Sequence, residues 1–222
     1  LGALRGLPAT QLGALSTAQI AALTPAQVGA LTAAQIGGLS GAQIAGLSVT
    51  QLKALSAGGV GGLTTTQVAA IAPDQLAQLT AAQIKGLTPL DLKSLSDSQV
   101  AALKTTQIAA FSATQIGGLT GSQLAGLTEA DMSEFGADQL GGLSATQLNG
   151  LSATNFSALS TTQVQTLSAT QISGLAESLF NTMSATDLAE FSTTQIGAFA
   201  STQLNTLSDA NFAALDATQI GR

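Results

Sequence analysis

The side chains that could do chemistry in this chain are mainly the hydroxyls of Ser and Thr and the amide of Gln, because Cys, His, Trp and Tyr are absent. A hydroxyl becomes a nucleophile when a base such as His or Lys lies beside it. The Lys residues are scattered along the chain, at Lys53, Lys85, Lys93 and Lys104. We therefore expect no catalytic residue and no cofactor, and we expect that the protein is not an enzyme.

Asp91, Asp131 and Asp187 are the candidates for a metal site, since carboxylate oxygens are ligands of Ca²⁺. None of them lies in an EF-hand loop. Each instead falls in the first turn of a helix predicted below, where a negative charge complements the helix dipole. The glycine-rich run 58–62 lacks the Lys of a phosphate-binding loop. The sequence thus predicts neither a metal site nor a phosphate site.

Composition argues against two classes of partner. The 222-residue chain has a net charge of -6 and a pI near 4.2, whereas nucleic-acid binding draws its affinity from Lys and Arg that neutralise phosphates. A transmembrane helix needs about 20 predominantly apolar residues. Here Ser, Thr or Gln interrupts the apolar residues in every octamer, so no stretch of that length occurs. We expect neither a nucleic-acid partner nor insertion into a membrane.

An eight-residue repeat accounts for the Ser, Thr and Gln. From Leu7 to Arg222 the chain divides without insertion or deletion into 27 octamers with the consensus Leu-(Ser/Thr)-x-x-Gln-(Ile/Leu/Val)-small-small. Position six is apolar in all 27 octamers, and Gln occupies position five in 20 of them. Residues 1–6 are a lead-in to this array. We expect residues 1–222 to form a single tandem-repeat domain and the array to continue in a longer parent protein.

The four fixed positions predict a helix start in every octamer. In a capping box, an N-cap Ser or Thr accepts a hydrogen bond from the N3 backbone, the N3 Gln reaches back to the N-cap N–H, and flanking apolar residues form a staple. The predicted caps are Ser16 with Gln19, Thr32 with Gln35, and Ser144 with Gln147; the predicted staple and core pairs are Leu31 with Ile36, and Leu143 with Leu148. Seventeen of the 24 glycines fall at positions seven and eight, where we expect them to end each helix in the left-handed conformation.

These features predict an all-α solenoid with one very short helix per octamer and three or four octamers per coil. Such helices are unstable alone, so stability must come from coils stacked around a core of positions one and six. A β-solenoid is the alternative, although an uninterrupted strand would place positions one and six on opposite faces. Echoes at 24 residues, such as Phe111 and Phe135, hint at three octamers per coil. Asp131 and Glu134 recur 56 residues later, which favours a duplication of seven octamers.

Two families share parts of this pattern. Residues 63–72 resemble the opening helix of TAL-effector repeats, but the longer period and the base-reading pair of that family are missing, so no DNA recognition is implied. Residues 7–222 resemble the Leu-(Ser/Thr)-x-x-Gln octapeptide arrays of very large bacterial secreted and surface proteins, some of them adhesins.

The second resemblance implies a structural role outside the cell or on its surface. The chain would be the stalk or rod of a bacterial adhesin, or a subunit of a self-assembling filament. Its partners would be copies of itself, end to end or side by side, or neighbouring domains of a larger surface protein. A protein- or peptide-binding scaffold that uses one face of the solenoid is the alternative. An ice-binding surface made of the small residues at positions three and four is a minor one.

Overall fold

The computed structural model describes residues 2–215 and 217–220. Every regular element in these residues is a helix of four to six residues, and one helix lies in each octamer. The prediction of an all-α repeat fold is confirmed. The β-solenoid alternative is not supported, since the described ranges contain no strand. No helix in them is long and apolar enough to cross a membrane.

The chain divides into two compact units, residues 1–118 and residues 119–222. Unit 1 contains α1 (Gly2–Arg5), α2 (Ala9–Gly13), α3 (Thr17–Ala21), α4 (Pro25–Gly29), α5 (Ala33–Gly37), α6 (Gly41–Ala45), α7 (Val49–Ala54), α8 (Ala57–Val60), α9 (Thr65–Ala70), α10 (Pro73–Leu76), α11 (Ala81–Ile84), α12 (Pro89–Ser94), α13 (Asp97–Ala101), α14 (Thr105–Ile108) and α15 (Ala113–Ile116). Unit 2 contains α16 (Gly121–Ala125), α17 (Glu129–Ser133), α18 (Ala137–Gly141), α19 (Ala145–Leu148), α20 (Ala153–Ser157), α21 (Thr161–Val164), α22 (Ala169–Ser173), α23 (Glu177–Phe180), α24 (Ala185–Ala189), α25 (Thr193–Ile196), α26 (Ser201–Thr206), α27 (Asp209–Ala213) and α28 (Ala217–Ile220). The octamer register of the sequence continues across their boundary, and a single array over residues 1–222 stays a prediction.

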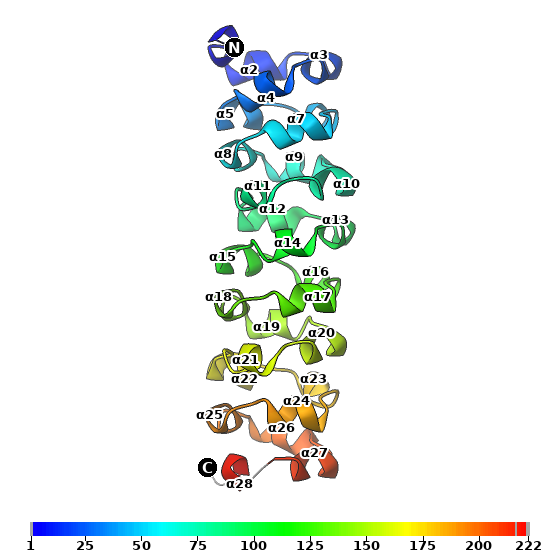
Figure 1. The fold of residues 1–222 in the computed structure, drawn as a ribbon, viewed down its shortest axis with the longest axis vertical. Coiled ribbons are helices and arrows are strands. Elements are labelled where there is room, and N and C mark those ends of the chain that lie inside the picture. The colour runs from blue at the N-terminus through cyan, green and yellow to red at the C-terminus, as the bar shows by residue number, and fades with distance from the viewer. Residues whose placement is uncertain (1, 216, 221–222) are drawn as a thin grey trace. The chain divides into compact units, whose positions relative to one another are not determined.

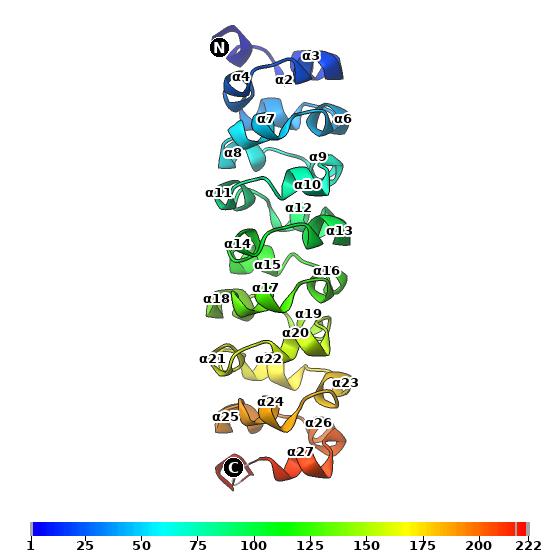
Figure 2. The same cartoon turned by 45° about the vertical axis from the view of Figure 1, so that its right-hand side comes forward.

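Three consecutive helices complete one coil in each unit. A helix packs against the third helix after it: α4 against α7 and α6 against α9 in unit 1, and α16 against α19 and α17 against α20 in unit 2. The successive layers within each unit can be followed in Figure 1 and, from a second direction, in Figure 2. Of the three or four octamers expected per coil, the structure has three. A spacing of 24 residues is therefore one full coil within each unit, whereas Phe111 and Phe135 belong to different units.

Positions one and six face the inside of the coils. Among the predicted core residues, Leu31 is 6% exposed, Leu143 is 3% exposed, and Ile36 and Leu148 are fully buried. Burying such a side chain contributes about 1.5–3 kcal/mol. A single octamer offers only two of them, so the core has to be shared between neighbouring coils.

The glycines do not act as left-handed helix ends. No described residue, glycine included, has a positive φ, so that prediction is wrong. Gly38, for example, has φ -82° and ψ -10°, and the N–H of Leu39 donates to the carbonyl of Ile36 at 3.1 Å. The helix therefore ends in a right-handed turn that any residue can adopt.

Close stacking of the coils explains the small residues at positions seven and eight. A Cβ placed on Gly62 would lie 2.5 Å from the carbonyl oxygen of Ala33 and 2.6 Å from its Cα. Ala33 begins the helix three octamers earlier. Larger side chains at this place would hold the two coils apart, because the backbone they meet cannot move aside as a flexible side chain can.

Candidate functional site

The repeated polar residues form capping boxes at the helix starts. Gln19 N donates to Ser16 Oγ at 3.2 Å, and Ser16 N donates to Gln19 Oε1 at 2.8 Å. The corresponding distances are 3.2 and 2.9 Å for Thr32 with Gln35, and 3.2 and 2.9 Å for Ser144 with Gln147. The structure thus brings each predicted pair together, with the N-cap residue extended and the Gln in the first turn.

The other end of the same Gln amide reaches the preceding coil. Gln67 Nε2 donates to the carbonyl of Leu39 at 2.5 Å and to that of Ile36 at 2.8 Å. In unit 2, Gln171 Nε2 donates to the carbonyls of Leu143 and Leu140, both at 2.8 Å. The acceptors lie 28 and 31 residues earlier in the chain. One side chain therefore closes a helix start and joins two coils.

We call this row of amides the glutamine ladder. Its rungs include Gln35, Gln43, Gln51, Gln67, Gln75, Gln83, Gln99, Gln107 and Gln115 in unit 1, and Gln147, Gln163, Gln171, Gln195, Gln203 and Gln219 in unit 2.

The ladder explains why position five carries Gln and never Glu. A Glu could complete the capping box, but it has no N–H to donate, and its charge would face backbone carbonyl oxygens in a buried place. Gln67 is only 1% exposed, and an unpaired charge there would be costly. The absence of Glu from position five in all 27 octamers is visible in the sequence. It was the signal that could have revealed this second role.

Natural substitutions at position five separate the two roles. Asn155 keeps the bond to the preceding coil, since its Nδ2 donates to the carbonyl of Leu127 at 2.8 Å, but its shorter side chain forms no capping box. Asp91 does the opposite. Its Oδ2 accepts from the N–H of Thr88 at 2.8 Å and from Thr88 Oγ1 at 2.7 Å. An ionised carboxylate has no N–H or O–H to donate to a carbonyl of the preceding coil.

The other two position-five carboxylates also serve as caps. Asp131 Oδ2 accepts from Thr128 N at 2.9 Å, and Asp187 Oδ2 accepts from Ser184 N at 2.6 Å. Asp131 Oδ1 is buried with no hydrogen-bond partner in the described residues. Within those residues, no group of three or more His, Cys, Asp or Glu is placed to hold a metal ion.

Residues 175–182 form an octamer that has lost both halves of its box, with Ala176 at the cap and Leu179 in place of Gln. The side chain of Asn149, in the preceding coil, binds the N–H that the missing Gln would have bound. Its Oδ1 accepts from the N–H of Ala176 at 2.6 Å, and its Nδ2 donates to the carbonyl of Gly174 at 2.9 Å. Sequence reasoning missed Asn149, because its partners lie about one coil further along the chain.

Two carboxylates of α24 and its C-terminal end meet hydroxyls of the preceding coil. Ser157 Oγ donates to Asp187 Oδ2 at 3.1 Å, and Thr161 Oγ1 donates to Glu190 Oε1 at 3.3 Å. Desolvation raises the pKa of the Glu190 carboxyl above its usual value of 4.5, the hydrogen bond from Thr161 opposes this, and the charge of Asp187 adds to the rise. These two hydrogen bonds join α24 and its C-terminal end to the preceding coil.

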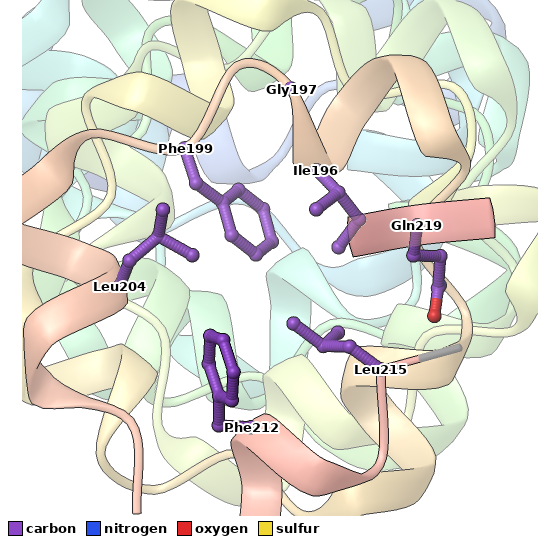
Figure 3. A pocket seen from close by; sticks show the side chains of 7 residues that line it. All are labelled: Ile196, Gly197, Phe199, Leu204, Phe212, Leu215 and Gln219. Atoms are coloured by element: carbon purple, nitrogen blue, oxygen red, sulfur yellow. The ribbon is translucent and has the colours of Figure 1, made fainter. Parts of the chain in front are cut away.

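An apolar cavity of about 280 Å³ lies among the last octamers of unit 2. It is lined by Ile196, Gly197, Phe199, Leu204, Phe212, Leu215 and Gln219, and Figure 3 shows these side chains around it. Phe199 also packs edge to face against Phe180, with ring centroids 4.8 Å apart. The described residues of this lining are apolar apart from the amide of Gln219, so they offer mainly packing surface.

Comparison with known proteins gives a match to a repeat family. A family model described as the ALTTAQ repeat matches residues 2–33. The six residues Ala14–Gln19 of this stretch read Ala-Leu-Ser-Thr-Ala-Gln, which is the last position of one octamer followed by five of the next. No curated protein matches the chain. The chain is therefore similar, over residues 2–33, to a family of tandem repeats, and its described residues fold as a helical repeat structure.

Proposed function

We propose that this structural repeat protein serves as a bacterial extracellular or cell-surface spacer, the stalk of an adhesin or the subunit of a surface filament, and that it is not an enzyme. The observation that carries the proposal is the glutamine ladder. It commits the polar side chains of the repeat to holding coils together, as Gln67 does with Leu39. A fold of this kind gains length and stability by adding coils.

The uniformity of the outer residues supports a spacer over a binding scaffold. Positions three and four are mostly Ala, Ser and Thr, whereas a recognition surface draws its energy from a few large side chains such as Trp, Tyr and Arg. Trp and Tyr are absent from the chain. The partners of a spacer are neighbouring domains of the same surface protein or further copies of the chain.

Changing the number of coils tests this proposal. Variants that lose or gain whole coils, by deleting or duplicating residues 31–54 within unit 1, keep every remaining octamer in register. We expect the longest dimension of the purified chain, measured by small-angle scattering, to change by a constant increment per coil. A dimension that does not depend on the number of coils would exclude a spacer.

Location is tested separately, on the bacterium that produces the protein. Antibodies raised against the purified chain should label intact cells. Labelling that requires permeabilised cells would contradict a surface location, whatever the scattering experiment shows.

A further inference from the structure

Asp91 interrupts a regular column of ladder rungs inside unit 1. The other rungs on the same side of the coils, spaced by one coil, are Gln43, Gln67 and Gln115. Each of their Nε2 groups donates to the position-one carbonyl 28 residues earlier, at 2.6, 2.5 and 2.7 Å respectively. A carboxylate thus stands in this column where every neighbour presents an amide donor.

The register of the coils places Asp91 opposite the carbonyl of Leu63, which lies 28 residues earlier. The rungs on either side of it along the chain, Gln83 and Gln99, donate to carbonyls at this same separation, at 2.8 and 2.7 Å. The carbonyl of Leu63 accepts no hydrogen bond from any described residue. Asp91 is 2% exposed and Leu63 is 6% exposed. The acceptor left by the missing amide is therefore removed from bulk water.

Only one oxygen of the Asp91 carboxylate has hydrogen-bond donors in the described residues. Oδ2 accepts from the N–H and the hydroxyl of Thr88, and no such bond reaches Oδ1. In a Gln rung one terminal atom forms the cap and the other faces the preceding coil, so we assign this second place to Oδ1. Asp131 has the same cap, and its Oδ1 is buried without a partner. The capping role that the sequence indicated accounts for half of each carboxylate.

A third position-five carboxylate shows what Asp91 lacks. Ser157, which lies 30 residues before Asp187, donates its hydroxyl to Asp187 Oδ2 at 3.1 Å. The residue 30 positions before Asp91 is Gly61, which has no side chain to donate. Lys93 is exposed and lies two residues from Asp91, and residues two apart do not face each other on a helix. A buried carboxylate without a donor or an opposite charge is costly.

We propose that Asp91 Oδ1 and the carbonyls of Leu63 and Val60 bind Ca²⁺ between two coils of unit 1. Val60 lies 31 residues before Asp91, at the separation of the second acceptor in rungs such as Gln67. A cation converts the repulsion between facing acceptors into attraction. Ca²⁺ accepts carboxylate and backbone carbonyl oxygens together with water in irregular geometry, whereas Mg²⁺ requires a near-ideal octahedron. One carboxylate takes part, and the other protein ligands are backbone oxygens.

Thermal unfolding followed by circular dichroism tests this site on the whole chain. Samples contain either a chelator or CaCl₂, and NaCl keeps their ionic strength equal. We expect Ca²⁺ to raise the melting temperature, because a ligand that binds only the folded state stabilises it. Half of the shift should be reached at about 0.1–1 mM Ca²⁺, the range of weak extracellular sites. Equal melting temperatures in chelator and in CaCl₂ would overturn the proposal in favour of water between the acceptors.

Asp91→Gln assigns the shift to this place. Gln keeps the cap and supplies a donor for the carbonyl of Leu63, as Gln67 does for Leu39. We therefore expect this variant to melt at a higher temperature than the unmodified chain in chelator and to gain less from Ca²⁺. Asp74→Asn is the matched control, because it removes the same charge from an exposed carboxylate, and it should keep the full shift. Equal Ca²⁺ shifts in the two variants would overturn the proposal.

Calorimetric titration and a second metal ion identify what is bound. Asp91→Gln should bind one Ca²⁺ fewer per chain than the unmodified protein does. MgCl₂ in place of CaCl₂ should give a smaller rise in melting temperature, because Mg²⁺ keeps its waters. An equal rise with Mg²⁺, or unchanged stoichiometry in Asp91→Gln, would contradict a calcium site at Asp91.

The inference goes beyond the proposed function, since a cation between coils can stabilise the array whether the chain is a spacer or a binding scaffold. The two ideas also fail separately. A chain that does not respond to Ca²⁺ can still lengthen with each added coil, and a chain that responds can still fail the scattering test.

Discussion

Asn149 Oδ1 accepts a 2.6 Å hydrogen bond from the backbone N–H of Ala176, 27 residues further along the chain. In residues 71–78, an octamer that also has Ala at the cap but keeps its Gln, this N–H donates to the Gln of its own helix: Ala72 N donates to Gln75 Oε1 at 3.1 Å. The helix start of residues 175–182 is therefore satisfied from another coil. A lost capping pair and a gained Asn appear in the sequence as unrelated substitutions, yet they form one hydrogen bond.

Removing Asn149 should expose this dependence. We expect Asn149→Ala to lower the free energy of unfolding by about 1–2 kcal/mol, since a backbone donor and a carbonyl lose their partners. Adding Leu179→Gln should recover much of the loss, because Gln can bind the cap N–H as Gln203 does that of Ala200 at 2.7 Å. Asn205→Ala is the control, at the place that echoes Asn149 after seven octamers. Urea denaturation followed by circular dichroism measures all three, and equal losses at Asn149 and Asn205 would contradict the assignment.

The two roles of a ladder rung can be separated at Gln67. Gln67→Glu keeps the capping oxygen but sets a buried charge against the carbonyls of Ile36 and Leu39, so we expect a loss of about 3 kcal/mol. Gln67→Asn should cost less, about 1 kcal/mol, because Asn retains the amide donor as Asn155 does. The same denaturation assay ranks the two variants. A Glu variant that is as stable as the Asn variant would show that the bond between coils contributes little.

Glycine at the stacking contact should tolerate no side chain. We expect Gly62→Ala to destabilise the chain by about 1–3 kcal/mol, because its Cβ would overlap the backbone of Ala33. Gly141→Ala provides the matched control, since a Cβ there meets no atom within 4 Å, and Ala is the better helix former. Its melting temperature should stay level or rise. Similar melting temperatures for the two variants would show that the coils can separate freely at position eight.

The carboxyl of Glu190 should make stability depend on pH. Because its pKa is raised in the folded state, the folded chain holds this proton more tightly than the unfolded chain does. The stability contributed by this group therefore rises as pH falls through the folded pKa toward the usual value of 4.5. Glu190→Gln should be more stable than the unmodified chain at neutral pH, with the difference shrinking in acid. A difference that is constant from neutral pH to pH 4 would contradict this linkage.

The local part of the fold was predictable from the sequence because it depends on residues three or four positions apart. The pair Ser16 and Gln19 is sufficient to place a helix start, and the apolar residues around it define the core. The fold class followed from the same spacing. Neither step required knowledge of which octamers lie side by side.

Relationships between coils were harder to predict, because their partners are about 24 to 31 residues apart and have no local signature. The hydrogen bond from Gln67 to the carbonyl of Leu39 is of this kind, and so is the one from the N–H of Ala176 to Asn149. The glycine prediction failed for the same reason. A turn and a close backbone approach both favour Gly, and only the position of Ala33 beside Gly62 shows which of them applies.

Three octamers per coil also determine how such a sequence can change in evolution. Recombination that adds or removes one octamer leaves every capping box intact and moves all later residues to the next side of the coil. Seven octamers amount to two coils and one further side. A duplication of seven octamers would therefore place the copy of Asp131 and Glu134, at Asp187 and Glu190, on a neighbouring side of unit 2. The array can lengthen in small genetic steps, and each step that is not a whole number of coils redistributes its surface chemistry without redesign of the core.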